Sequence, residues 1–350
     1  MDETTFRILD TLTREIGRPL SILELTSKIK ELHETAYYAN TYRQLRNMAA
    51  HGLISLTKAG KSAIASLNPT SYLLIDLLTE IELTRKRKFL QKRPELNLIF
   101  ADLDKQCKDL DFIKSISMIR PEKNFKLNRI ELLIILRNHD FSNIAKIHEI
   151  LRGIQRRYNI RIDYLPLQTA ELLRMLGSDE DNPLKEMLAD KICLLSAQSF
   201  WGDILDSMRE GLRIRSEEKE SYPSKIGEQS LTYNLARFGY REFGPEIRQS
   251  RDICKELLAA SLLISDDARR IEAIPIILAK GKTNWHLLIF LTEKYGLSGR
   301  LFGLLKALYH YKPTKDLEEA IKLLELTDVK ETKADMRSIG EKLRLYDAIR

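Results

Sequence analysis

The sequence predicts an α+β protein that is mostly helical. Apolar residues recur at helical spacing over most of the 350 residues. A pattern of two short strands around a basic turn occupies residues 53–67. Residues 112–165 then read as strand, strand, helix and strand, which is typical of a small mixed sheet covered by helices. A chain of this length corresponds to two or three domains.

Composition excludes several classes of protein. Apolar residues make up 43% of the chain and charged residues 31%, as in a globular protein. The net charge of +7 favours a polyanionic partner. Three cysteines with no CxxC spacing argue against a zinc site or a disulfide framework. With no apolar leader and no apolar run long enough to cross a bilayer, we expect a cytoplasmic protein with no membrane partner.

Residues 1–69 are expected to form a first domain. Apolar residues recur at helical spacing from Phe6 to Ile16, and Pro19 ends that helix. Ser21 is placed to cap a second helix that runs to Leu32. A third helix follows.

That third helix is predicted over residues 37–51. Its spacing places Tyr38, Tyr42, Leu45 and Ala49 on one face, which we interpret as the packing face. The opposite, polar face carries Tyr37, Asn40, Arg43, Gln44 and Asn47.

A hairpin completes this domain. Strands are expected at residues 53–57 and 62–67, around a basic turn that carries Lys58 and Lys61. Three helices followed by a hairpin resemble the winged helix-turn-helix family, particularly in the run AHGLI at residues 50–54 and the run LNP at residues 67–69.

The resemblance implies a module that binds double-stranded DNA. The polar face of the third helix would enter a major groove, where Asn and Gln suit adenine and Arg suits guanine. Lys58 and Lys61 would meet phosphates or the minor groove. Such proteins often bind palindromic sites as dimers, so a homodimer is also expected. The alternative is that this domain docks another protein.

Residues 70–110 are predicted to form a helical connector. Pro94 separates its two helices. The basic run at residues 85–88 is interpreted as a solvated helix face, with a nucleic-acid backbone or an acidic partner as the alternative.

Residues 111–215 are expected to form the mixed-sheet domain. The strand at residues 128–135 is similar to the Ser-Asp-x-Asp-Leu strand of the minimal nucleotidyltransferases of the DNA polymerase beta superfamily. Arg129 stands at the first aspartate of that motif, Glu131 at the second and Asp163 at the third. Ile119 and Arg120 replace its Gly-Ser turn. The resemblance extends to residues 182–185 and to an apolar helix that ends near residue 201.

In that family, carboxylates hold the Mg²⁺ ions that activate a nucleoside triphosphate. An arginine at the first position would repel a cation. Glu131 and Asp163 could still hold one metal ion, could form ion pairs with Arg129 and Arg161, or could simply face solvent. We favour the ion pairs, with no cofactor. A phosphate-bearing ligand on the basic loop, held without catalysis by Arg120, Arg129 and the lysines at 123 and 126, remains open.

Residues 225–350 are predicted to form an all-helical domain that serves as a site for a protein partner. A linker is expected at residues 216–228. Six helices are expected, at residues 245–261, 266–278, 285–295, 298–310, 316–324 and 333–347.

The sequence therefore predicts a DNA-binding protein of transcription regulation or scaffolding that carries a pseudoenzyme domain with no catalytic residues. The alternative is an active, metal-dependent nucleotidyltransferase that acts on protein or RNA with Mg²⁺ and a nucleoside triphosphate.

Overall fold

The computed structural model describes residues 1–60, 62–121, 128–214, 222–241, 247–265 and 267–349. These residues are mostly helical and include two small sheets, so the predicted α+β class is confirmed. Among them, none of the helices combines the length and the apolar character needed to cross a membrane.

The N-terminal unit, residues 1–69, combines three helices with a three-stranded antiparallel sheet of order β1-β3-β2. Ser21 accepts a hydrogen bond from the backbone N–H of Glu24 at 3.2 Å, so it caps α2 as predicted. The sequence did not indicate β1, which is only two residues long. The elements are α1 (Glu3–Arg14), β1 (Leu20–Ser21), α2 (Ile22–His33), α3 (Tyr38–Ala50), β2 (Ile54–Ala59) and β3 (Ser62–Leu67).

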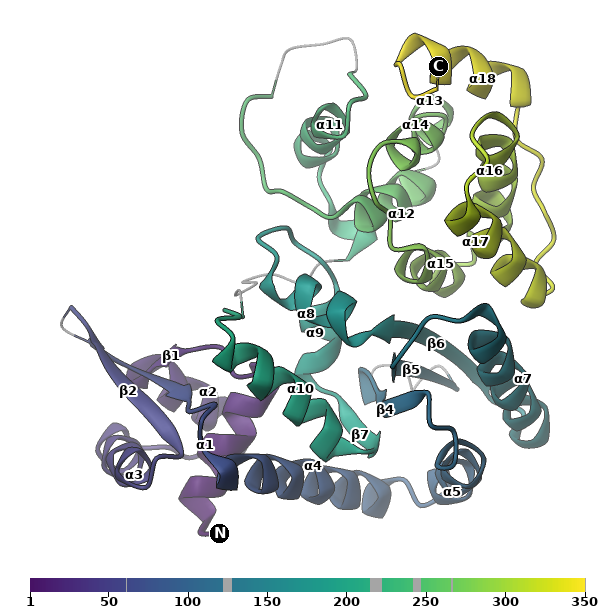
Figure 1. Ribbon diagram of the computed structural model, residues 1–350. Coiled ribbons are helices and arrows are strands. Elements are labelled where there is room, and N and C mark those ends of the chain that lie inside the picture. The colour runs from purple at the N-terminus through teal and green to yellow at the C-terminus, as the bar shows by residue number, and fades with distance from the viewer. Residues whose placement is uncertain (61, 122–127, 215–221, 242–246, 266, 350) are drawn as a thin grey trace.

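A long helix connects this unit to the rest of the chain. Figure 1 shows α4 (Tyr72–Lys92) running beneath α10 (Ala197–Arg209), with the N-terminal unit at one end and α5 (Leu96–Cys107) at the other. It packs against α1, α10 and β7 (Ile192–Leu195). Its basic run is only in part the solvated face we expected: Arg87 and Lys88 are exposed, but Arg85 is buried.

The central unit, residues 111–214, is built on a four-stranded mixed sheet of order β6-β5-β4-β7. β5 and β6 are parallel, and the other two pairings are antiparallel. β7 was not predicted, and the expected apolar helix begins rather than ends near Trp201. The remaining elements are β4 (Ile113–Met118), β5 (Arg129–Leu136), α7 (Phe141–Tyr158), β6 (Arg161–Gln168), α8 (Thr169–Gly177) and α9 (Leu184–Ala189).

Helices of the C-terminal bundle form a separate lobe above the sheet (Figure 1). The expected helix at 245–261 begins only at Lys255, and the expected helix at 266–278 is divided into two short ones. The bundle comprises η1 (Pro223–Lys225), α11 (Glu228–Arg237), α12 (Lys255–Ser265), α13 (Ala268–Ile271), α14 (Ile274–Ala279), α15 (Trp285–Lys294), α16 (Ser298–Tyr311), α17 (Lys315–Leu326) and α18 (Met336–Leu345). α15 packs against β6, so its last turn reaches the edge of the central sheet.

Candidate functional site

Parallel pairing of β5 and β6 creates a charged cluster at the start of both strands. The register places Arg129 opposite Arg161 and Glu131 opposite Asp163. Because alternate residues of a strand point to the same face, all four side chains are brought together. The sequence-predicted residues Arg129, Glu131 and Asp163 therefore lie in one site.

Ion pairs fill this cluster. The Nε atom of Arg129 pairs with Oδ2 of Asp163 and lies 3.7 Å from Oε1 of Glu131. Arg161 donates from its Nε atom to Oδ1 of Asp163 at 3.0 Å. The ion pairs expected of Arg129 and Arg161 are therefore present. The interpretation of these side chains as solvent-facing is wrong, since Glu131 and Asp163 are 0% and 3% exposed.

Two further cations converge on Glu131. The Nζ atom of Lys294, in the last turn of α15, lies 3.0 Å from Oε1 of Glu131. The Nε atom of Arg120 lies 4.0 Å from Oε2. Sequence reasoning missed Lys294, because no local pattern connects a bundle helix to a strand 163 residues earlier. It also placed Arg120 on a polar loop, whereas the side chain is only 6% exposed.

The bundle also holds this cluster through its backbone. Arg129 donates to the carbonyl oxygen of Lys294 at 3.2 Å, and Arg161 donates to that of Glu293 at 2.9 Å. These carbonyls end α15, where the helix dipole is negative and favours cations. The guanidinium groups are therefore held by carboxylates on one side and by a helix end on the other.

Burial and charge perturb the groups in the cluster. Burial raises the pKa of Glu131, but the charges of Arg120, Lys294 and Arg129 outweigh that effect and hold the pKa below its ordinary value. Burial lowers the pKa of Lys294, and Arg120 lowers it further. Burial, together with Asp163, raises the pKa of Glu293 to about 7. The cluster therefore contains an ionised Glu131, and Glu293, near Asp163, has a pKa raised toward neutral pH.

The charged cluster lies at the positions where the sequence resemblance places metal-holding carboxylates. The described residues contain no group of three His, Cys, Asp or Glu side chains able to hold a metal ion. Four cationic side chains instead surround Glu131 and Asp163, and a divalent cation entering there would meet like charge. The lysines at 123 and 126, which we considered as phosphate contacts, lie outside the described residues.

Arg120 itself adopts a left-handed backbone conformation, with a φ of 48°. Glycine reaches this region at no steric cost, whereas a side chain makes it unfavourable by roughly 1 kcal/mol. Arg120 therefore keeps a glycine-like turn at the position where the resemblance places a Gly-Ser turn. Its side chain fills the approach to Glu131.

A second candidate site lies on α3. Asn40, Arg43 and Asn47 are exposed there, as predicted. Tyr37 is also exposed, at 70%. Gln44 is half-buried and donates hydrogen bonds to Asp2 at 3.1 Å and to Thr5 at 2.6 Å, so it ties α3 to α1 instead of facing outward.

The predicted packing face of α3 is wrong in part. Tyr38 and Tyr42 are 51% and 38% exposed, and their rings stack in parallel with centroids 6.2 Å apart. The helix packs through Thr41, Leu45 and Met48 instead, a face rotated from the expected one. Arg46 extends the aromatic stack, with its guanidinium carbon 6.0 Å from the centre of the Tyr42 ring.

The predicted turn of the hairpin is shorter than expected. Lys58 lies within β2 and is exposed, and Gly60 turns the chain with a φ of 62°. Lys61, the second predicted contact of this hairpin, lies outside the described residues.

Comparison with family models, curated proteins and solved structures produced no match for this chain. The function is therefore argued from the two sites alone, since a fold does not by itself specify an activity.

Proposed function

We propose that this protein is a DNA-binding regulator or scaffold, with a winged helix at residues 1–69 and a central domain that resembles a nucleotidyltransferase but does not transfer nucleotides. The order of elements supports the first part: two helices flank a short strand, and a third helix precedes a hairpin. The pairing of β1 with β3 joins the hairpin to the helices as one unit.

The observation that carries the DNA-binding proposal is the exposed face of α3. Asn40, Arg43 and Asn47 project there, with Arg46 and Lys58 exposed nearby in the sequence. Amide and guanidinium groups on one helix read base edges in a major groove, and lysines contact phosphates. The net charge of +7 adds long-range attraction to a polyanion.

A duplex-binding assay tests this proposal. Fluorescence anisotropy with labelled duplexes, repeated over a series of salt concentrations, should show affinity falling steeply as salt rises. The double variant Arg43→Ala, Lys58→Ala should bind more weakly and reduce the salt slope by about one per lost phosphate contact.

Its matched control is Lys105→Ala, Lys108→Ala, which removes two exposed lysines near the end of α5 and leaves α3 intact. If both double variants bind duplex as tightly as the wild type, the N-terminal unit does not contact DNA through α3.

One observation favours the alternative of an active enzyme: the register that brings Glu131 beside Asp163, the pair that would hold a metal. Against it stand the ion pairs of both carboxylates with Arg129. Incubation with labelled nucleoside triphosphate in Mg²⁺ or Mn²⁺ should transfer no label to protein or RNA. Transfer that Glu131→Ala abolishes would establish the enzyme instead.

A further inference from the structure

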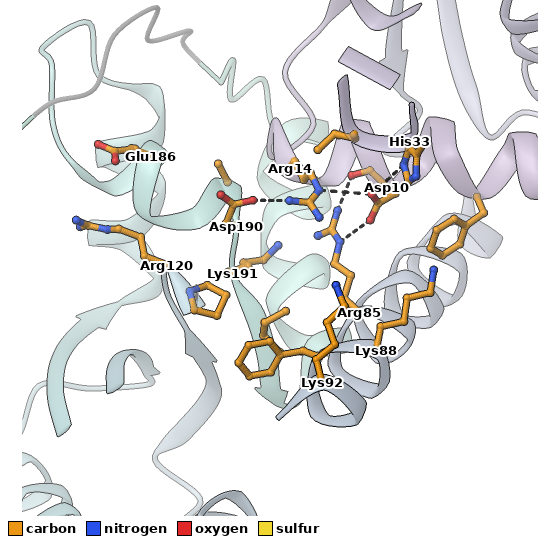
Figure 2. Close-up of a pocket in the computed structure, with 16 residues that line it drawn as sticks. Asp10, Arg14, His33, Arg85, Lys88, Lys92, Arg120, Glu186, Asp190 and Lys191 are labelled. Carbon is orange, nitrogen blue, oxygen red and sulfur yellow. Dashed lines mark hydrogen bonds and ion pairs between the residues drawn. The ribbon is translucent and has the colours of Figure 1, made fainter. Parts of the chain in front are cut away.

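A cleft of about 630 Å³ opens where the N-terminal unit, α4 and the central unit meet. Figure 2 shows its walls. Asp10 and Arg14 come from α1, and Arg85, Lys88 and Lys92 come from α4. The central unit contributes Arg120, Glu186, Asp190 and Lys191. A cavity of this size accommodates a small organic ligand of nucleotide dimensions. Its lining shares Arg120 with the charged cluster and no residue with α3.

Two buried ion pairs and one exposed pair connect these walls. Arg85 donates to Oδ1 of Asp10 at 2.5 Å and so fixes α4 to α1. Lys191, which precedes β7, donates to Glu82 of α4 at 2.6 Å, and both side chains are fully buried. Arg14 pairs with Asp190 across the cleft (Figure 2). The cavity is thus bounded by fixed elements, and a ligand need not order them on binding.

Positive charge exceeds negative charge in the lining. Six Arg and Lys side chains and three carboxylates line the cleft, and two of the cations, Lys191 and Arg120, pair with Glu82 and Glu131 outside it. Asp10 and Asp190 pair with Arg85 and Arg14, as described above. Within the part of the chain that the structure describes, Lys88 and Lys92 have no carboxylate at ion-pair distance. Both lie on α4 one turn apart, so their ammonium groups face the same side of the helix.

His33 lies in the wall of the same cleft. Its Nε2 atom lies 3.3 Å from Oδ2 of Asp10, a contact that would normally raise the pKa. Burial nevertheless lowers the pKa of His33, and the charges of Arg7, Arg14 and Lys88 lower it further.

Apolar side chains line the same space. Phe6, Phe89, Pro121 and Ile192 are among the lining residues. The ammonium of Lys88 lies 4.9 Å from the centre of the Phe6 ring, so a cation and an aromatic surface are adjacent. A flat base fits the apolar surface, and a chain of phosphates fits the lysines.

We propose that this cleft binds a nucleoside triphosphate without hydrolysing it, with the phosphates on Lys88 and Lys92 and the base against Phe6 and Phe89. The ligand would contact the N-terminal unit, α4 and the central unit at once. This binding does not depend on the DNA-binding proposal, because the cleft lies away from α3.

Isothermal titration calorimetry of the full chain with ATP, in the absence of DNA, tests the site. The wild type should bind ATP more tightly than AMP or inorganic tripolyphosphate. Lys88→Ala, Lys92→Ala should weaken binding by about tenfold or more, as expected for two lost charge-assisted hydrogen bonds. Arg87→Ala, Lys105→Ala is the matched control: it removes two exposed cations outside the cleft and should bind like the wild type.

Several outcomes would overturn the proposal. The first is that ATP gives no heat of binding, and the second is that the two double variants lose ATP affinity equally. The third is that tripolyphosphate binds as tightly as ATP, which would show that the base is not recognised. Competition by single-stranded DNA that depends on Lys88 and Lys92 would assign the cleft to nucleic acid instead. Because the DNA-binding variants at Arg43 and Lys58 leave the cleft intact, failure of one proposal leaves the other standing.

Discussion

At the scale of single residues, the buried charges in the cluster at the start of β5 and β6 are paired with opposite charges. Glu131 and Asp163 would be unstable as isolated buried carboxylates, because each ion leaves water at a cost of several kcal/mol. Arg129 lies between them, and its Nε atom is within ion-pair distance of both carboxylates. An arginine at this position therefore compensates the charge of both buried carboxylates.

Replacing Asp163 should show how much the cluster contributes to stability. Asp163→Asn removes the carboxylate that pairs with Arg129 and Arg161 and leaves the buried Arg129 guanidinium with less compensation. We expect a loss of about 3 kcal/mol in the free energy of unfolding at pH 7, measured by urea denaturation. Asp109→Asn, at an exposed position, should cost less than about 0.5 kcal/mol. Equal losses would mean that Asp163 contributes no more than a surface aspartate.

Glu293 should make stability depend on pH. Its pKa rises from an ordinary value of 4.5 to about 7 in the folded protein, mainly through burial. Between these values the folded state keeps a proton that the unfolded state has lost, so this group's contribution to stability falls as pH rises. Glu293→Gln removes this pH-dependent contribution to the free energy of unfolding. The variant's free energy of unfolding minus that of the wild type should therefore increase from pH 5 to pH 7.

Urea denaturation at half-unit pH intervals measures this difference. Because other groups titrate in both proteins, only the difference is diagnostic. Glu325→Gln, at an exposed position, gives the baseline for replacing a carboxylate. If the difference in the free energy of unfolding between variant and wild type is the same from pH 5 to pH 7, Glu293 titrates normally.

Among secondary-structure elements, α4 shows why a run of like charges is hard to interpret from sequence. The four basic residues at 85–88 occupy more than one full turn, so they point in all directions. Arg85 is buried against Asp10, Lys86 donates to the carbonyl of Leu194 at 3.1 Å, and Arg87 is exposed. Counting charges could not distinguish these roles, because they depend on which elements pack around the helix.

Arg85 should therefore be far more sensitive to substitution than its neighbour. Arg85→Ala leaves Asp10 and Glu82 in the interior with one cation fewer, and we expect a loss of about 3–5 kcal/mol in the free energy of unfolding. Arg87→Ala should change it by less than about 0.5 kcal/mol. Thermal denaturation followed by circular dichroism compares the two. Similar melting temperatures would show that Arg85 does not hold α4 on α1.

The sequence was most informative where local chemistry decides an element. Ser21 at the start of α2 and the apolar strand β5 were predicted because a cap or an apolar run acts within a few residues. The packing face of α3 was not predicted correctly, because Tyr38 and Tyr42 have apolar rings, which helical periodicity alone assigns to the core. The core beneath α3 is formed by distant residues, and they select Thr41 and Met48 instead.

At the scale of the whole molecule, the charged cluster depends on the bundle. Arg129, Glu131 and Asp163 could be placed together from sequence, because the resemblance assigns all three to one motif, and the register of β5 and β6 brings them together. Lys294 could not, since its approach depends on how α15 docks onto β6. The last turn of α15 supplies an ammonium to Glu131 and two carbonyls to the arginines, so the bundle and the sheet share one electrostatic site.

Reversing the charge of Lys294 should loosen that docking. The ammonium of Lys294 lies 3.0 Å from Oε1 of the buried Glu131, and Lys294→Glu replaces it with a carboxylate. Two carboxylates this close repel each other strongly because they are shielded from water. We expect faster amide exchange in α15 and at the start of β5 and β6, measured by hydrogen–deuterium exchange. Lys294→Met, which keeps the aliphatic stem, should show a smaller increase. Lys282→Glu, at an exposed bundle position, should leave exchange at these strands unchanged. If all three variants exchange like the wild type, the bundle is held on the sheet by apolar packing and Lys294 contributes nothing to it.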